Sequence, residues 1–368
     1  MTTRHGAATT ARPAGRALVR NMSAPAPATD EVKLVLDARP AYDFVVSLLL
    51  DTDPELLADD ATWLAESRAS FSDAVRRDVQ RSFEDDENGA GLGLALVALV
   101  VEDPAIRTSA DVMALAGRIG VADLVTGLCE MERIEDPRGL ATAALAGDAE
   151  ARERLLAATG DWTRPTVARA LDDPEGELRA MRRALRAWHE RFQSLEGRVA
   201  SMQDRDVESR RAETRSLPLL DFVEKTTGGI RWVREPGVTR LVLAPSYFAR
   251  PYNYLFGDRE VRVICYPLGD AALDGDTGAL PTATLRLFKA LGDESRLRIL
   301  RLLADGDLYL TEIAERMSLS KPTVKHHMML LRAAGLVTVT ETGGLTYYSL
   351  RRERLADASG DLRRLVGA

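Results

Sequence analysis

The stretch SLSKPTVKHHMMLLRAAG, residues 318–335, decides the fold of the C-terminal part of this 368-residue chain. Ser320 is a favoured helix N-cap, and Pro322 fits the first turn of a helix because no backbone amide is lost there. Gly335 is a typical residue at which a helix ends. These signals predict one helix between Ser320 and Gly335, preceded by a three-residue turn.

The two sides of this helix differ in chemistry. At 100° per residue, Val324, Met328 and Leu331 share a narrow arc with His327 at its border, so we expect this side to face a core. The opposite side and the amino-terminal end carry the polar and basic residues Lys321, Thr323, Lys325 and His326. The helix dipole at that end favours phosphate, and lysine and imidazole donors can contact guanine or phosphate oxygens. A solvated basic face is the alternative, and His327 alone is more typical of a structural histidine than of a base reader.

The neighbouring segments complete a winged helix-turn-helix pattern. Amphipathic helices are predicted over residues 282–291, 293–305 and 310–317. After Gly335, LVTVTE and LTYYSL alternate apolar and polar residues around a Thr-Gly-Gly turn at 342–344, which predicts a two-stranded hairpin. In a helix-turn-helix protein the amino-terminal half of the second helix enters the major groove of DNA.

This part of the chain resembles a known family of DNA-binding proteins. The segments ALGDESRLRIL (290–300), TEIAERMSLSKPTVKHHMMLLRAAGLV (311–337) and YYSL (347–350) match, in order, the signature of the ArsR/SmtB family of winged-helix transcriptional regulators. The resemblance implies a homodimer on a pseudo-palindromic double-stranded DNA operator, with the hairpin at the adjacent DNA backbone. It places Lys321, Thr323, Lys325 and His326 toward DNA and His327 at the family's typical histidine. With Ser320 at the helix start, these residues are our predicted DNA-binding set.

Two departures from the family pattern bear on function. Metal-sensing members carry a cysteine pair near the start of the third helix, where this chain has DLYLT (307–311), or a histidine on the C-terminal helix, which has none here. We therefore expect no metal site and no cofactor. The predicted wing tip, residues 341–344, lacks the arginines common in relatives, so we expect Arg351, Arg352 and Arg354 to supply that phosphate contact.

Charge and composition divide the chain. Residues 281–368 hold 14 Lys and Arg against 10 Asp and Glu, so they carry +4 of a chain whose net charge is −7. We predict a mainly α protein with small β elements, made of a disordered tail (1–30), an N-terminal α+β regulatory or sensor domain (31–268), a linker (269–281) and the winged helix-turn-helix (282–368). Met22 is an alternative start of the chain.

The predicted sensor domain combines helices with a small sheet. Residues 54–170 alternate helical patches with breakers, and a long helix is predicted over 175–215, with a heptad stripe from Leu178 to Met202. We expect that stripe to pack on its own domain, with an intermolecular coiled coil as the alternative. Strand-like segments at 230–233, 239–244 and 259–266 predict a small sheet or meander. Two stretches, AYDFVVSLLL and LAPSYFARPYNYLF, resemble the extra domain of a mainly actinobacterial subgroup of the same regulators.

An aromatic cluster suggests a binding site in this domain. Aromatic residues are only 5% of the chain, yet five fall within ten positions: Tyr247, Phe248, Tyr252, Tyr254 and Phe256. They are our candidate pocket for a non-metal small-molecule effector, with a local core as the equally weighted alternative.

The remaining features narrow the class of function. The two cysteines, Cys129 and Cys265, form no disulfide framework and favour a reducing cytoplasm, and the longest apolar run, Gly89–Val101, is too short to span a membrane. Catalytic and nucleotide-binding motifs are absent from the sequence, so we expect no enzyme. We predict a cytoplasmic, dimeric, sequence-specific transcriptional regulator, by the family's usual output a repressor. A protein–protein interaction module and an enzyme fused to a regulator are the alternatives.

Overall fold

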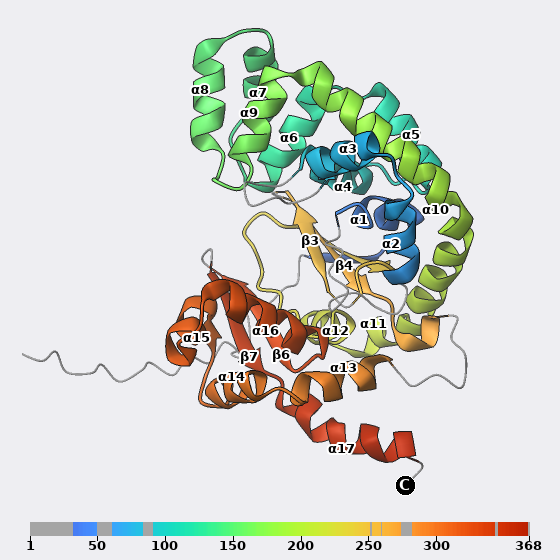
Figure 1. Ribbon diagram of the computed structural model, residues 1–368, viewed down its shortest axis with the longest axis vertical. Coiled ribbons are helices and arrows are strands. Elements are labelled where there is room, and N and C mark those ends of the chain that lie inside the picture. Colours follow the sequence, from blue (N-terminus) through green and yellow to red (C-terminus); the bar gives the residue numbers. More distant parts are fainter. Residues whose placement is uncertain are drawn as a thin grey trace, which may run out of the picture.

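The computed structural model describes residues 32–49, 61–83, 91–250, 252–258, 260–273, 282–342 and 345–366. The predicted tail (1–30) and most of the predicted linker lie outside these ranges. We call residues 32–273 the N-terminal part and residues 282–366 the winged part. In Figure 1 the helices α3 to α9 lie above the sheet that contains β3 and β4, α10 runs down one side of it, and the winged part lies below it.

The N-terminal part is mainly helical, as predicted. Its longer helices are α1 (Pro40–Val46), α2 (Ala61–Ala69), α3 (Asp73–Phe83), α4 (Ala95–Glu102), α5 (Ser109–Arg118), α6 (Val121–Met131), α7 (Pro137–Leu145), α8 (Ala149–Ala158), α9 (Arg164–Asp172), α10 (Pro174–Arg210) and α12 (Leu219–Thr226), and the single turn α11 (Glu213–Ser216) follows α10. Among the described residues no single helix is long and apolar enough to cross a bilayer, although α5 and α6, a pair bent by 112°, together meet that length and composition.

The sheet of the N-terminal part mixes parallel and antiparallel pairs. Its strands are β1 (Lys33–Leu36), β2 (Arg240–Ser246), β3 (Tyr254–Gly257) and β4 (Val261–Pro267), in the order β1-β2-β4-β3. β1, β2 and β4 are parallel, and β3 is antiparallel to β4. A sheet was therefore predicted correctly, but not the parallel pairing of β1 with β2 across some 200 residues of chain. The predicted strand at 230–233 is not part of this sheet.

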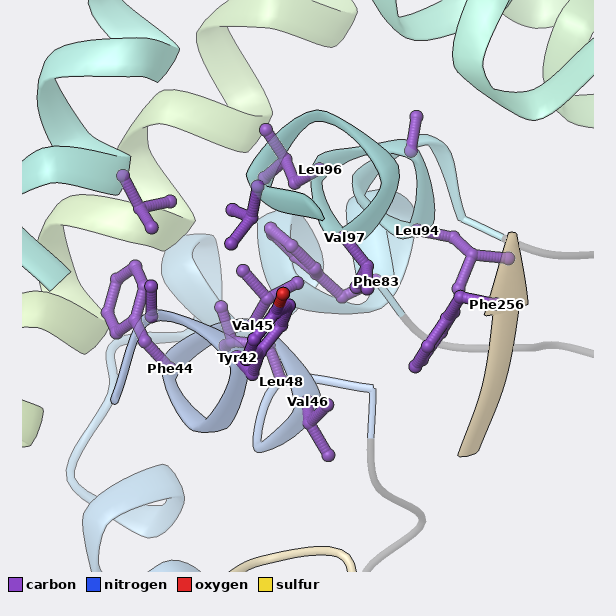
Figure 2. Packing of buried hydrophobic residues seen from close by; sticks show 14 of the residues in the cluster. Tyr42, Phe44, Val45, Val46, Leu48, Phe83, Leu94, Leu96, Val97 and Phe256 are labelled. Atoms are coloured by element: carbon purple, nitrogen blue, oxygen red, sulfur yellow. The ribbon is translucent and has the colours of Figure 1, made fainter. Parts of the chain in front are cut away.

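Two cores lie on opposite faces of this sheet because side chains alternate along each strand. Val242 and Ala244 of β2 belong to the large helical core, whereas Leu241 and Leu243 belong to a smaller core with Phe222 of α12. Figure 2 shows the part of the large core around α1 and α4, with Phe256 of β3 at its edge.

The heptad stripe of α10 is buried inside this large core. Trp188 and Phe192 are 0% exposed, Val199 and Met202 are 1% exposed, and Trp188 Nε1 donates to the hydroxyl of Ser47 at 2.8 Å. The stripe therefore packs on its own chain, the first of the two interpretations, and is not available for an intermolecular coil.

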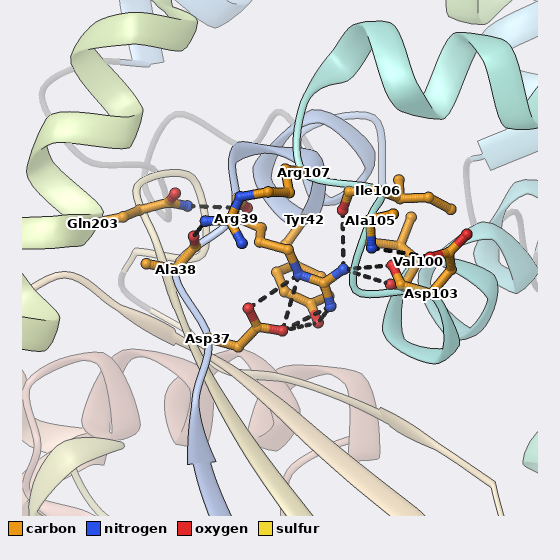
Figure 3. A network of polar contacts seen from close by, with 10 residues as sticks. All are labelled: Asp37, Ala38, Arg39, Tyr42, Val100, Asp103, Ala105, Ile106, Arg107 and Gln203. Carbon is orange, nitrogen blue, oxygen red and sulfur yellow. Dashed lines mark hydrogen bonds and ion pairs between the residues drawn. The ribbon is translucent and has the colours of Figure 1, made fainter.

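A buried arginine ties β1 to the helical layer (Figure 3). Arg39 is 2% exposed, and its Nη1 donates to the carbonyls of Val100, Asp103 and Ile106 at 2.8–2.9 Å. Its Nε donates to Asp37 at the end of β1. Because the last carbonyls of a helix have no partner within it, Arg39 both satisfies the end of α4 and fixes the corner between β1 and α1.

The winged part has the predicted helices and hairpin in the predicted order, with a short strand, β5, that was not predicted. It contains α13 (Thr282–Leu291), α14 (Glu294–Ala304), β5 (Leu308–Tyr309), α15 (Leu310–Met317), α16 (Lys321–Ala333), β6 (Val337–Thr342), β7 (Leu345–Leu350) and α17 (Arg352–Val366). β6 and β7 form the antiparallel hairpin, and β5 pairs with β7 in the order β5-β7-β6. The fold is therefore mainly α with small β elements and ends in a winged helix-turn-helix.

Candidate nucleic-acid interface

The helix α16 is held in the winged part by its apolar side. Val324, Met328 and Leu331 are at most 1% exposed and lie in the core that α13, α14 and α15 share. Ser320 caps the helix, since its hydroxyl accepts from the N–H of Thr323 at 3.3 Å. The predicted core-facing side is therefore confirmed.

The polar end of the same helix faces solvent. Lys321, Thr323 and Lys325 are exposed, and His326 is half-buried. Two lysine charges thus coincide with the positive end of the helix dipole. Backbone donors, a hydroxyl and two ammonium groups at one helix end form an arrangement suited to an anionic ligand such as a phosphate backbone.

The turn before α16 fixes the angle between α15 and α16. Ser318 ends α15 in the left-handed conformation, with φ of 54°, and Leu319 N–H bonds the carbonyl of Ala314 at 3.1 Å. This closing bond is the Schellman arrangement that glycine usually provides. A serine in this position costs backbone energy, so the surrounding packing maintains the turn.

His327 lies between the core side and the polar side of α16. Its Nδ1 is 3.9 Å from the carboxylate of Asp293, the N-cap of α14, and has no hydrogen-bond partner among the described residues. Burial lowers the pKa of His327; Asp293 opposes this, and Arg296 and His326 add to it. An imidazole with 14% of its side chain exposed and a lowered pKa supports the structural alternative for His327 over base reading.

The three arginines after the hairpin differ in how their guanidinium groups are bound within the chain. Arg351 Nη1 donates to the carbonyls of Gly228 at 3.0 Å and Gly335 at 3.3 Å, and Arg354 pairs with Asp361 at 2.6 Å. Burial lowers the pKa of Arg351. The guanidinium of Arg351 thus already binds backbone carbonyls of its own chain, and its phosphate contact stays a prediction. Arg352 is exposed, with one bond to the carbonyl of Ala304, and remains a candidate.

The predicted aromatic pocket is largely a core. Tyr247, Phe248 and Phe256 are 3–6% exposed and belong to the large core, while Tyr252 and Tyr254 are half-buried. The ring of Phe248 lies 5.9 Å from Trp63 and 6.2 Å from Phe192. These rings pack on α2 and α10, which is the local-core alternative.

A pocket does exist nearby, but other residues line most of it. Of the five aromatic residues, Phe256 alone lines the pocket of about 780 Å³ formed by residues 230–236 together with β3 and the winged part. Sequence reasoning missed this pocket, since its lining comes from segments between Met131 and Thr346 and has no linear pattern. Among the described residues, no group of three or more His, Cys, Asp or Glu side chains could hold a metal ion.

Known sequences match the winged part. The family described as "Bacterial regulatory protein, arsR family" matches residues 293–339, which run from the N-cap of α14 into β6. The transcriptional repressor SdpR of Bacillus subtilis is 39% identical over 72 residues, which are 20% of this chain and 80% of that protein. The chain belongs to the ArsR family. It is thus a member of a family of transcriptional regulators, as its sequence resemblance implied.

Other ArsR relatives match to a similar extent. The regulator CmtR of Mycobacterium tuberculosis is 39% identical over 85 residues, 23% of this chain and 72% of CmtR. The arsenical resistance operon repressor of Staphylococcus aureus is 39% identical over 71 residues, 19% of this chain and 68% of that repressor. Among solved structures, HlyU from Vibrio cholerae matches with 32% identity and a TM-score of 0.20, covering 23% of this chain and 94% of HlyU. All these matches cover a quarter of this chain or less.

Proposed function

We propose that this ArsR-family protein is a sequence-specific DNA-binding repressor that acts as a homodimer and whose N-terminal part modulates DNA binding. One observation carries the proposal: α16 buries Val324, Met328 and Leu331 while leaving Lys321 and Lys325 exposed at its amino-terminal end. In helix-turn-helix proteins that end of the second helix enters the major groove. The relatives SdpR and the arsenical resistance operon repressor are named as repressors, which favours repression as the output.

Exposed apolar residues support a homodimer. Leu285 on α13 is 36% exposed and Leu362 on α17 is 45% exposed, and α13 and α17 pack on each other. Apolar side chains on two neighbouring helices offer a surface that a second copy can cover. Two copies would place two α16 helices on a pseudo-palindromic operator, whose half-sites lie one helical turn apart in such complexes.

The test is a mobility-shift measurement with DNA from upstream of the protein's own gene, over a series of salt concentrations. We expect selective binding that weakens with salt, because log K falls by about 0.9 per neutralised phosphate for each unit of log salt concentration. The double variant Lys325→Ala, His326→Ala should lose selective binding and keep its melting temperature. Lys289→Ala, which removes an exposed charge from α13, is the matched control.

The outcomes separate this function from the interaction-module alternative. Unchanged selectivity in the Lys325→Ala, His326→Ala variant would place the reading surface elsewhere. No selective shift with any upstream fragment, together with a protein partner captured in stoichiometric yield by crosslinking, would favour a protein-interaction module instead.

A further inference from the structure

A short segment of the N-terminal part is hydrogen-bonded to the wing. Ile230 pairs with Val339 of β6 as a parallel bridge: Arg231 N–H donates to the carbonyl of Val339 at 3.0 Å, and Val339 N–H donates to the carbonyl of Gly229 at 2.9 Å. The segment 229–231 thus covers the outer edge of the sheet β5-β7-β6. Backbone pairing of this kind fixes position and register, so movement of the segment must move β6 or break these bonds.

Glycine is required where this contact forms. Gly229 has φ of 128°, a conformation that side chains rarely allow, and a Cβ there would lie 3.1 Å from the carbonyl oxygen of Val337. Arg351 adds a third bond on the same side, from its Nη1 to the carbonyl of Gly228 at 3.0 Å. The N-terminal part and the wing are therefore joined by specific backbone contacts.

The pocket of about 780 Å³ lies beside this contact. Residues 230–236 line one side, β3 and β4 contribute further residues, and the winged part contributes Arg332 of α16, Val339 of β6 and Thr346 of β7. Its volume is within the range of small-molecule sites, which are about 300–1,000 Å³. A molecule in this pocket would touch the N-terminal part, the helix α16 and the wing at once.

The pocket's charge is positive. Five of its sixteen lining residues are arginines and one is an acid, Glu235; the arginines are Arg133, Arg231, Arg234, Arg262 and Arg332. Glu235 pairs with Arg133 at 2.6 Å and with Arg262, and Arg231 pairs with Glu224, which is not part of the lining, at 3.0 Å. By formal charge, the lining residues therefore carry five guanidinium groups and one carboxylate. Planar guanidinium forks are the side chains that best recognise carboxylate and phosphate groups.

Apolar side chains supply the rest of the lining. They include Ile230, Trp232, Leu255, Phe256 and Val339. Trp232 is 6% exposed and Phe256 is 3% exposed, so the surrounding packing holds both side chains in place. An apolar surface beside several arginines is complementary to a molecule with an acidic group and a hydrocarbon body.

We propose that this pocket binds a small organic anion with an apolar body, and that its binding changes DNA affinity through the segment 229–231 and β6. The effect on DNA affinity rests on the proposed function, whereas the binding of the anion does not. The anion is held by arginines of both parts, so its binding depends on how the two parts are placed relative to each other. By linkage, an anion that alters DNA affinity must itself bind with an affinity that DNA alters by the same factor.

The binding test uses the full chain, with 1-naphthylacetate and octanoate as probes and their neutral amides as controls. Titration calorimetry should show that the anions bind about tenfold or more tightly than the amides, because charge-assisted hydrogen bonds are lost in the amides. The anions should also raise the melting temperature. Equal binding of anions and amides, or no binding of either anion at millimolar concentration, overturns the proposal.

Variants locate the binding to this pocket. Arg234→Gln combined with Arg332→Gln should weaken anion binding about tenfold or more. Arg186→Gln, at an exposed position of α10 outside the pocket, should leave the binding unchanged. Should the double variant fail to fold, Arg133→Gln at the 38% exposed rim replaces it with the same expected direction. Anion binding that none of the pocket variants weakens would place the site elsewhere.

The coupling test repeats the mobility shift with saturating 1-naphthylacetate. We expect the DNA affinity to change about fivefold or more, and DNA to change the affinity for the anion by the same factor. Anion binding with unchanged DNA affinity overturns the regulatory half. Calorimetry needs no DNA, so a protein that binds the anion but shows no selective shift refutes the proposed function and not the pocket.

Discussion

The carboxylate of Asp293 lies 3.9 Å from Nδ1 of His327, so the N-cap of α14 faces the second histidine of α16. Asp293 also accepts from Arg296 N–H at 2.9 Å, which keeps its carboxylate in place, and its pKa is lowered chiefly by that backbone bond. The contact joins α14 of the winged part to α16, the helix that carries Lys321 and Lys325.

We predict that His327 makes the protein less stable in mild acid. Because burial lowers the pKa of His327 in the folded state, the unfolded chain binds the proton first as pH falls through the ordinary histidine pKa of 6.5. The contribution of His327 is therefore present above that pH and decreases below it. Urea unfolding measured from pH 8 down to pH 5 should show a steeper decrease in the free energy of unfolding for the wild type than for His327→Gln. Parallel curves for the two proteins would contradict this.

Asp43 should act in the opposite direction. This buried carboxylate accepts from Ser246 Oγ, from the N–H groups of Tyr247 and Phe248, and from Gln203. Burial nevertheless raises its pKa from 3.8 to about 6. The folded protein therefore binds this proton more readily than the unfolded chain, and the stability that results is full below about pH 3.8 and lost as pH rises through about 6.

The variant Asp43→Asn isolates that effect. We expect it to lower the free energy of unfolding at pH 7 by about 1–3 kcal/mol, because the asparagine amide points an N–H donor at groups that are themselves donors. The wild type's advantage should shrink by on the order of 3 kcal/mol between pH 4 and pH 7. Denaturant unfolding of both proteins measures this difference, and an advantage that grows with pH would refute the assignment.

Ser318 offers a stabilising substitution. Its left-handed φ of 54° costs a serine backbone energy that glycine does not incur. Ser318→Gly should raise the free energy of unfolding by up to about 1 kcal/mol, after the entropy that glycine adds to the unfolded chain. Ser318→Ala keeps the unfavourable geometry and should give no gain. Equal effects of the two substitutions would show that the turn relaxes.

The proposed dimer surface can be tested by placing one charge on each of its two helices. Leu285→Glu and Leu362→Glu each place a carboxylate on the exposed apolar surface of α13 or α17 and should shift the protein toward monomer in light scattering coupled to gel filtration. Trp162→Glu changes a residue of similar exposure, 47%, in the N-terminal part and should leave the mass unchanged. Dimers that persist in both leucine variants would place the interface elsewhere.

Gly229→Ala tests the contact between the N-terminal part and the wing. The alanine must keep a backbone φ of 128°, and its Cβ would lie 3.1 Å from the carbonyl oxygen of Val337. The hydrogen bonds between the segment 229–231 and Val339 should therefore weaken. We expect 1-naphthylacetate still to bind and its effect on DNA affinity to fall toward zero, as measured by mobility shift with and without the anion. An undiminished effect would mean that the signal takes another route.

The sequence alone determined the helix α16 and its surroundings. Ser320, Pro322 and Gly335 are local signals, and the spacing of Val324, Met328 and Leu331 fixes which side of a helix is apolar whatever covers it. These features depend on neighbours within one or two turns of the chain, which is why the order of elements from α13 to α17 and the family could be predicted. The long helix α10 was predictable for the same reason.

Only the tertiary structure decided what each apolar or charged surface meets. Periodicity shows that the stripe of α10 is apolar but not whether its own chain covers it, and aromatic enrichment at Tyr247–Phe256 is the same for a core and a pocket. The segment 230–233 has strand-forming residues, yet its partner is β6, about a hundred residues away. The partners of Arg351 and the grouping of the pocket arginines were not predictable either, because long-range packing brings together side chains that no local pattern relates.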